Sequence, residues 1–225
     1  MPRTARVAPG GVIFHVLNRA NARVRIFEDD RDYQTLEQVI AETVQRVPVR
    51  LLAYCIMPNH WHMLVWPRGD GDLGAFMQRL TTTHVRRWHL HRQSVGSGHL
   101  YQGTYKCFPI QDDKHFLAVC RYVEQNALRA GLVRRAEDWR WSSLWLRLVG
   151  EAEQNIPALS EWPVSRPQSW VSLVNQPQVP KELEVLRLSV QRGRPYGTEV
   201  WQRWMATHLG LESTFRSRGR PRKER

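Results

Sequence analysis

The segment VRLLAYCIMPNHWHMLVWP, residues 49–67, contains two apolar runs separated only by Pro58 and Asn59. Residues 49–57 and 60–66 are rich in β-branched, aromatic and other apolar side chains, which favours β-strands. A two-residue connection is the length of a tight hairpin turn. This stretch therefore predicts two antiparallel strands that pair with each other.

The segments on either side of the hairpin complete a mixed fold. Apolar and turn residues predict strands over residues 12–20 and 100–110, and helical spacing predicts helices over 29–46, 73–92 and 112–130. The resulting order β-α-β-β-α-β-α is that of a ferredoxin-like, split-βαβ fold. The sequence thus predicts an α+β protein with an antiparallel sheet of four to five strands.

The composition changes near residue 150. Residues 151–180 are rich in Pro, Ser, Gln and Trp, which indicates a linker or a loosely wrapped segment. Two short helices are expected at 181–191 and 197–209, followed by the basic tail RSRGRPRKER. We therefore expect one domain over residues 1–150 and a helical, basic extension over 151–225.

The charge of the chain indicates a polyanionic partner. It has 33 Lys and Arg against 21 Asp and Glu, a net charge of +12. Most of the basic residues are Arg, which binds phosphate in a bidentate manner. Nucleic acid is the commonest such partner, with an anionic membrane surface as the alternative. No apolar run approaches the roughly 20 residues that a membrane-spanning helix needs, so no membrane insertion is expected.

Two histidines lie in the second strand of the hairpin. Because side chains alternate along a strand, His60 and His62 point to one side and Trp61 points to the other, toward the core. Two imidazoles at this spacing can bind one metal ion, but they can equally be packed structural histidines. No further His or Asp ligand is evident nearby in the sequence. The pair alone leaves both interpretations open.

A second chemical feature is RYVEQNALRAGLV, residues 121–133. Tyr122 and Asn126 are four residues apart in the expected helix and share one face. Tyrosine can act as a nucleophile, and asparagine can supply a neutral oxygen ligand. The alternative is a tyrosine that packs on the sheet and an asparagine that caps the helix.

Together these motifs resemble the HUH (His-hydrophobic-His) single-tyrosine transposases, and within them the REP-associated tyrosine transposases. The resemblance rests on PNHWH followed by YxxxNxxRAGLV, and on AYCIMPNHWHMLVWP, DWRWSS (138–143), RGRPYG (192–197) and LGLES (209–213). It implies a transposase that cleaves and rejoins single-stranded DNA at REP-type hairpins through a 5′-phosphotyrosine intermediate.

The resemblance also implies roles for individual residues. His60 and His62 match the metal-binding pair, Tyr122 the nucleophile and Asn126 the polar ligand one turn later. The expected metal is Mg²⁺ or Mn²⁺. Thr104 stands where Arg is frequent in the family, which puts one phosphate contact in doubt.

Basic residues outside these motifs are candidates for holding the DNA backbone, although each could also belong to a solvated charged face. The predicted DNA-binding residues are Arg79, Arg86, Arg87, Arg92, Lys106, Arg129, Arg192, Arg194, Arg218 and Arg220. The basic tail is interpreted as a flexible clamp on DNA.

The remaining expectations concern context. Three widely spaced cysteines, Cys55, Cys107 and Cys120, indicate buried thiols in a reducing compartment and hence a cytoplasmic protein. The expected partner is hairpin DNA with single-stranded flanks, not a small-molecule substrate. A monomer is favoured, with a dimer left open. The alternative functions are a domesticated DNA-binding protein without transposition and a nickase similar to replication initiators.

Overall fold

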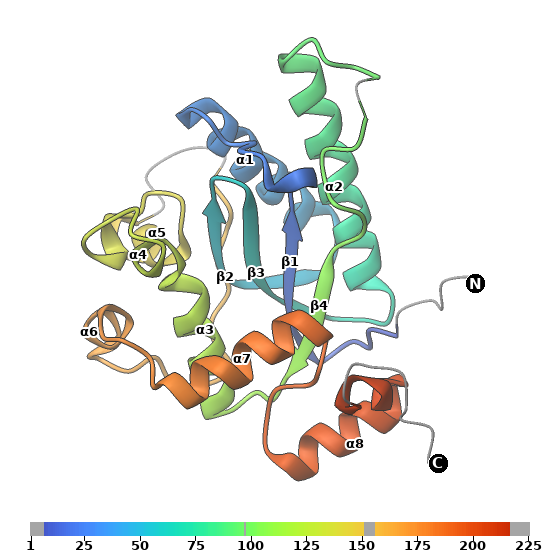
Figure 1. The fold of residues 1–225 in the computed structure, drawn as a ribbon, viewed down its shortest axis with the longest axis vertical. Coiled ribbons are helices and arrows are strands. Elements are labelled where there is room, and N and C mark those ends of the chain that lie inside the picture. The colour runs from blue at the N-terminus through green and yellow to red at the C-terminus, as the bar shows by residue number, and fades with distance from the viewer. Residues whose placement is uncertain (1–6, 97, 151–155, 217–225) are drawn as a thin grey trace, which may run out of the picture.

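The computed structural model describes residues 7–96, 98–150 and 156–216. A four-stranded antiparallel sheet in the order β2-β3-β1-β4 carries helices on both faces (Figure 1). The strands are β1 (Ile13–Arg19), β2 (Val49–Met57), β3 (His60–Pro67) and β4 (Lys106–Ile110). The helices are α1 (Asp30–Arg46), α2 (Asp72–His91), α3 (Lys114–Glu124), α4 (Asn126–Arg129), α5 (Ser143–Val149), α6 (Trp170–Asn175), α7 (Pro180–Arg192) and α8 (Glu199–Leu209), with short 3-10 turns at Asn21–Arg23, Ala136–Asp138 and Glu212–Phe215. The predicted α+β class with an antiparallel sheet is confirmed.

The hairpin at residues 49–67 forms as predicted. Met57 of β2 lies opposite His60 of β3, so Pro58 and Asn59 alone make the turn. The Pro58 carbonyl accepts hydrogen bonds from the backbone N–H groups of Ile26 and Phe27, at 2.9 and 3.1 Å. These bonds attach the segment before α1 to the hairpin tip. In the sheet, β3 is an inner strand between β2 and β1.

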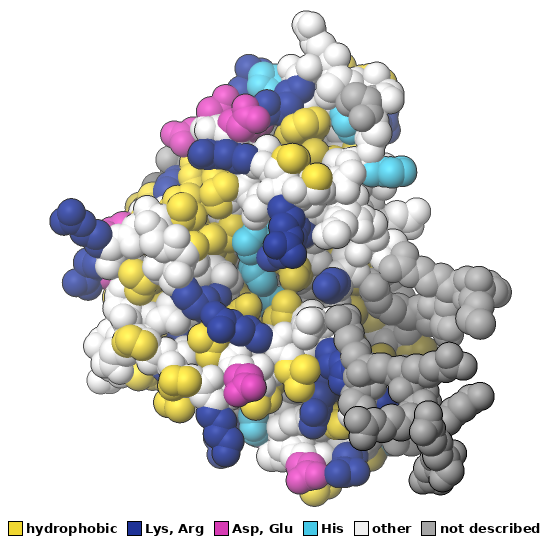
Figure 2. Space-filling view, in the orientation of Figure 1, with side chains coloured by type: hydrophobic (Ala, Val, Ile, Leu, Met, Phe, Trp, Pro, Cys, Tyr) yellow, Lys and Arg dark blue, Asp and Glu magenta, His cyan; other side chains and the backbone are white. Residues whose placement is uncertain are grey.

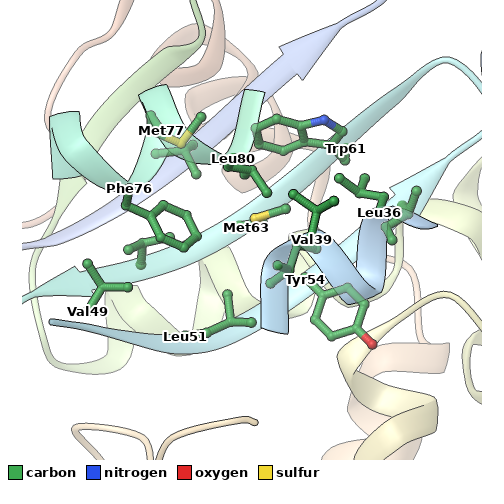
Figure 3. Packing of buried hydrophobic residues seen from close by; sticks show 14 of the residues in the cluster. Leu36, Val39, Val49, Leu51, Tyr54, Trp61, Met63, Phe76, Met77 and Leu80 are labelled. Atoms are coloured by element: carbon green, nitrogen blue, oxygen red, sulfur yellow. The ribbon is translucent and has the colours of Figure 1, made fainter. Parts of the chain in front are cut away.

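One face of the sheet packs against α1 and α2. Trp61 and Met63 of β3 point to this side and are fully buried, as the alternation of side chains predicts for Trp61. Figure 3 shows Met63 between Val39 of α1 and Leu80 of α2. This face forms the larger of two hydrophobic clusters.

The opposite face packs against the helices that follow β4. Leu64 of β3 and Phe108 of β4 are buried there with Val119 and Val123 of α3. The N-terminus of α3 is capped by Asp113, whose side chain accepts a hydrogen bond from the His115 N–H. Because His60 and His62 share the orientation of Leu64, the packing of α3 decides what surrounds them.

Two predicted elements differ in extent. The strand expected at 100–110 is regular only from Lys106, because Gly103 has a φ of +111°, which an L-residue in a strand cannot adopt. The helix expected at 112–130 is divided into α3 and α4 around Gln125. It ends as predicted near Gly131, which has a φ of +70°.

The C-terminal segment packs on the same sheet. Trp170 of α6 and Leu186 of α7 are buried in the cluster around α3, and the Trp170 indole donates a 2.7 Å hydrogen bond to Glu124. Tyr196 forms a parallel bridge with Ile110 of β4. The described part of the segment expected to be a linker, residues 156–180, thus includes a helix, and the domain division at residue 150 stays a prediction.

Within the described ranges, no helix has both the length and the apolar composition that a bilayer-crossing segment requires.

Candidate active site around two histidines and a tyrosine

The fold brings the HxH pair and the tyrosine motif together. The ring centroids of His60 and His62 lie 5.0 Å apart, and the Tyr122 ring lies 5.8 Å from that of His62. Tyr122 comes from α3, which packs across β2 and β3, and its side chain is largely buried against the sheet. Residues 60 positions apart in sequence therefore meet in one site, and their chemical roles remain predictions.

His60 is oriented by its neighbour in the hairpin turn. Its Nδ1 lies 2.6 Å from the amide oxygen of Asn59, and the Asn59 amide nitrogen donates to the Arg23 carbonyl at 3.0 Å. An amide oxygen can only accept a hydrogen bond, so the proton belongs to His60 Nδ1. The Nε2 of the neutral ring then keeps its lone pair for another ligand.

A third histidine, which sequence reasoning missed, contacts His62. His15 of β1 is buried, and its Nε2 lies 2.8 Å from His62 Nδ1. His15 is a hydrogen-bond partner of His62, and among the described residues it does not form a group of three metal-ligating side chains with the pair. The available signal was the position of His15 in the strand at 12–20, but only the pairing of β1 with β3 brings it beside His62.

The hydrogen bond to His15 has a chemical consequence for His62. If His62 Nδ1 donates and His15 Nε2 accepts, His62 Nε2 keeps its lone pair. This is the arrangement in which a histidine ligand of a metal donates its other N–H to a neighbouring acceptor. His15 itself stacks on Phe108 with ring centroids 4.8 Å apart, which holds the acceptor in place.

Burial keeps these imidazoles neutral. It lowers the pKa of His60 to about 4, with the positive charges of Arg19 and Arg129 acting in the same direction. Burial also lowers the pKa of His15 to about 3, and it lowers the pKa of His62 well below its usual range. Neutral rings at pH 7 suit metal ligation rather than proton transfer.

These pKa shifts predict a loss of stability in mild acid. His15, His60 and His84 have pKa values of about 3, 4 and 3, against 6.5 in the unfolded chain. Below pH 6.5 the unfolded state takes up protons that the folded state excludes, so the free energy of unfolding falls as the pH falls. We expect a loss of about 1 kcal/mol per buried histidine between pH 7.5 and 5.5.

Urea unfolding at pH 7.5 and pH 5.5 measures this loss. The His84→Gln variant, which removes one buried titrating group, should lose less free energy between the two pH values than wild type. Equal unfolding free energies of the wild type at both pH values would contradict the prediction.

Asn126 and Arg129 complete the surroundings of Tyr122. The Arg129 guanidinium lies 4.2 Å from the centre of the Tyr122 ring and donates a 2.7 Å hydrogen bond to the Asn126 side-chain oxygen. The Asn126 amide nitrogen donates to the Tyr122 carbonyl at 3.3 Å, which confirms their predicted separation by one helical turn. The oxygen expected to bind metal is thus already held by Arg129, although it retains a second lone pair.

The residues present fit a divalent cation that takes further ligands from its substrate. In the parts of the chain that the structure describes, no group of three or more His, Cys, Asp or Glu side chains is arranged to hold a metal ion. The predicted donors, His60, His62 and Asn126, would supply two imidazole nitrogens and one amide oxygen. Phosphate oxygens and water would have to complete the coordination, as they do at many Mg²⁺ sites.

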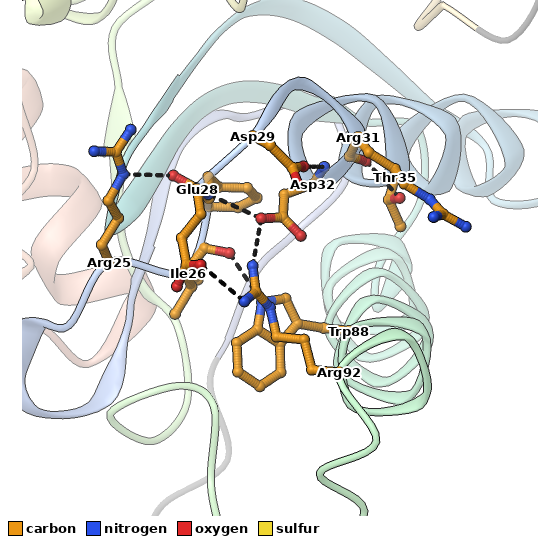
Figure 4. A network of polar contacts seen from close by, with 10 residues as sticks. Arg25, Ile26, Glu28, Asp29, Arg31, Asp32, Thr35, Trp88 and Arg92 are labelled. Atoms are coloured by element: carbon orange, nitrogen blue, oxygen red, sulfur yellow. Dashed lines mark hydrogen bonds and ion pairs between the residues drawn. The ribbon is translucent and has the colours of Figure 1, made fainter.

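Two of the arginines predicted to bind DNA are paired with acidic side chains. Arg92 lies 2.6 Å from Asp32 and 3.0 Å from Glu28, as Figure 4 shows, and Arg87 lies 2.7 Å from Glu42. These ion pairs connect α2 with α1 and the segment before it. Contacts of Arg87 and Arg92 with DNA stay predictions, and both side chains have a structural partner.

The other predicted DNA-binding residues are distributed over several surfaces. Arg86 is exposed on α2, where Arg79 is half-buried. Arg194 donates to the Gln202 side chain at 3.1 Å and lies over the Phe215 ring, close to Arg192 at the end of α7. Arg218 and Arg220 lie outside the described residues. Lys106 is exposed and, unlike the others, lines a cavity together with Tyr122.

The surface around the site is basic. Figure 2 shows histidine side chains near the centre of this face with Lys and Arg side chains around them. Arg19, Arg23 and Arg187, which sequence reasoning did not select, line the same cavity as Tyr122. No local sequence pattern links these three residues, because Arg19 and Arg23 lie at the end of β1 and in the turn after it, whereas Arg187 lies far away in the sequence on α7.

Comparison with known proteins identifies relatives of this chain. Residues 10–126 match the family model described as "Transposase IS200 like". The REP-associated tyrosine transposase of Escherichia coli K12 is 24% identical over 136 residues, which are 60% of this chain and 76% of that protein. A Haemophilus influenzae protein assigned to the same group is 26% identical over 110 residues, 45% of this chain, and the chain spans only 62% of that relative.

The structure of a REP-associated tyrosine transposase bound to a REP hairpin shares this fold. It has a TM-score of 0.54 and 20% sequence identity, covering 71% of this chain and 93% of that one.

Proposed function

Since this chain belongs to the IS200-like transposase family, we propose that it cleaves and rejoins single-stranded DNA at hairpin sequences, with Tyr122 as the nucleophile. The observation that carries this proposal is the position of Tyr122 beside His62, which forms a pair of neutral histidines with His60. In both histidines Nδ1 contacts a neighbouring side chain, so Nε2 is available for a ligand. A protein that only binds DNA needs no such arrangement. Hairpin DNA as the substrate is supported by the hairpin bound to the structural relative.

In the proposed reaction, the Tyr122 oxygen attacks the phosphorus of a phosphodiester. The new P–O bond to tyrosine forms as the bond to the 3′ oxygen breaks, so the phenol loses a proton and the departing oxygen gains one. The product is a 5′-phosphotyrosine and a free 3′-OH. Because the energy of the phosphodiester is kept in the tyrosine ester, the 3′-OH of another strand can reverse the reaction and join the strands.

Arg129 assists the attacking group in this proposal. Its guanidinium lies over the Tyr122 ring and favours negative charge on the phenol as the proton leaves. It also holds Asn126 beside the tyrosine. Arg129 was predicted as a DNA contact, and a place beside the nucleophile allows it to face the scissile phosphate as well.

We further propose that His60, His62 and Asn126 hold Mg²⁺ or Mn²⁺. When bound there, such an ion would neutralise charge on the non-bridging phosphate oxygens. His15 and Asn59 keep the two rings oriented, which leaves both Nε2 atoms available. The nitrogen donors make Mn²⁺ the better probe of this site, since imidazole is a less suitable ligand for Mg²⁺.

The proposed activity is tested by incubating the protein with a labelled DNA hairpin that carries single-stranded flanks, in the presence of Mg²⁺ or Mn²⁺. A covalent adduct should run with the protein on a denaturing gel, and mass spectrometry should locate the nucleotide on Tyr122. Hairpin binding without an adduct under either metal would favour a DNA-binding protein that does not cleave. Hydrolysed strands without rejoining would favour a nickase.

Replacing His15 tests the orientation of His62. His15→Phe keeps the ring that stacks on Phe108 but removes the acceptor for His62 Nδ1. Loss of such an outer partner typically lowers metal affinity by about 10- to 100-fold, and we expect an effect of this size on Mn²⁺ binding. Calorimetric titration of Mn²⁺ measures it.

The matched control is His84→Phe, a buried histidine on the opposite face of the sheet, which should leave Mn²⁺ affinity unchanged. Wild-type Mn²⁺ affinity in His15→Phe would show that His62 does not depend on this contact.

A further inference from the structure

A cavity of about 530 Å³ opens beside Tyr122. Its walls come from β1, the 3-10 turn after it, the segment leading into β4, and helix α7. The α7 residues in the wall are Arg187, Val190 and Gln191. The family model ends at residue 126, so α7 is a wall supplied from outside the part of the chain that matches the model.

The cavity is cationic. Four of its lining side chains are basic, namely Arg19, Arg23, Lys106 and Arg187, and none of those that the structure records is acidic. Across the described residues, no carboxylate pairs with any of these four. Arg87 on α2 and Arg92 directly after it, in contrast, are each neutralised by carboxylates. Positive charges left without internal partners around one cavity favour a polyanion there.

One side chain of the cavity wall also has an unsatisfied polar atom. The Arg19 Nε is buried and has no hydrogen-bond acceptor in the described structure, which is equally true of Arg92 Nε, so the difference between the two sets of arginines rests on the missing carboxylate partners.

The position of α7 is fixed by its packing. Leu186 of α7 is fully buried in the hydrophobic cluster around α3, whereas the next residue, Arg187, is exposed. The bridge between Tyr196 and Ile110 anchors the chain after the helix to β4. Arg187 is therefore held by a rigid element beside the cavity rather than by a loop.

We propose that this cavity is the groove for the unpaired DNA strand that flanks the hairpin, and that Arg187 of α7 holds one of its backbone phosphates next to the scissile bond. This inference rests on the proposed function and adds a phosphate-binding residue to it. An unpaired strand is the fitting ligand, because Tyr122 is 93% buried and a phosphate must enter the cavity to reach it. Gln102 and Gln191 offer amide groups to the sugars or bases of that strand.

The salt dependence of binding tests this groove. Hairpins with and without a single-stranded flank are titrated in EDTA, where no cleavage is expected, at several salt concentrations. The slope of log K against log salt is negative, and losing one phosphate contact to a single strand makes it shallower by about 0.7. We expect this change for Arg187→Ala with the flanked hairpin, and a larger loss of affinity, about tenfold or more, for Arg187→Glu.

The matched control is Lys181→Glu, an exposed basic residue on the same helix that does not line the cavity. It should change flanked-hairpin affinity by less than about twofold. Binding of the unflanked hairpin should be the same in wild type and Arg187→Ala.

A wild-type slope and affinity in both Arg187 variants would overturn the proposed groove. An equal loss for flanked and unflanked hairpins would also overturn it, because Arg187 would then contact the hairpin itself. The proposed function fails separately, if the wild-type protein forms no adduct with Mg²⁺ or Mn²⁺. The binding experiment in EDTA does not depend on that reaction.

Discussion

Tyr122→Phe is expected to abolish the covalent protein–DNA adduct while hairpin affinity stays within about twofold of wild type. Phenylalanine keeps the ring that lies beside His62 and under Arg129, so the packing of α3 on the sheet is retained. It lacks the oxygen that would bond to phosphorus. Cleavage should therefore fall to the background rate.

The measurement is adduct formation on a denaturing gel together with binding by fluorescence anisotropy. Tyr33→Phe is the matched control, because Tyr33 is buried on the opposite face of the sheet between Phe27 and Trp141. It should form the adduct at the wild-type rate. An adduct that persists in Tyr122→Phe would show that another residue is the nucleophile.

Trp61→Ala is expected to cost about 3–5 kcal/mol of unfolding free energy, a large part of the roughly 5–15 kcal/mol typical of a folded domain. Trp61 is fully buried between the sheet and α2, and its indole N–H donates a 2.9 Å hydrogen bond to the Tyr101 oxygen. The Tyr101 hydroxyl lies 2.7 Å from His84 Nδ1. The substitution therefore leaves a cavity and removes one bond from a buried polar chain.

Urea unfolding followed by circular dichroism measures this loss. Trp204→Ala, at a tryptophan that is 53% exposed on α8, should change the free energy by less than about 1 kcal/mol. If Trp61→Ala does not fold, Trp61→Phe provides the comparison, because it keeps an aromatic ring and loses the indole donor at a cost of about 1–3 kcal/mol. Wild-type stability in either Trp61 variant would contradict the central role of this residue in the core.

The two effects separate the faces of one strand. Trp61 faces the helices α1 and α2 and stabilises the fold, whereas His60 and His62 face α3, which carries the proposed nucleophile. Because successive side chains of a strand point to opposite sides, a single hairpin supplies both. Variants of the histidines should thus alter metal binding with little effect on the larger hydrophobic cluster.

The sequence by itself determined the main helices and strands of residues 12–130, the hairpin at 49–67, and the opposite orientations of Trp61 and the two histidines. It also singled out His60, His62, Tyr122 and Asn126 as candidate site residues. The elements and orientations follow from local rules, namely the period of two in strands and of 3.6 in helices. The extents of β4 and of the helix at 112–130 were less predictable, because Gly103 and Gln125 interrupt elements whose apolar pattern continues.

Only the tertiary structure decided which residues meet around Tyr122. The pairing of β1 with β3 brings His15 to His62, and the packing of α7 across the sheet brings Arg187 to the cavity. It also showed that Arg87 and Arg92 have carboxylate partners, which the arginine pattern on α2 does not reveal. The physical reason is that contacts between distant segments depend on strand order and helix packing, and neither leaves a periodic signal in the residues that make the contacts.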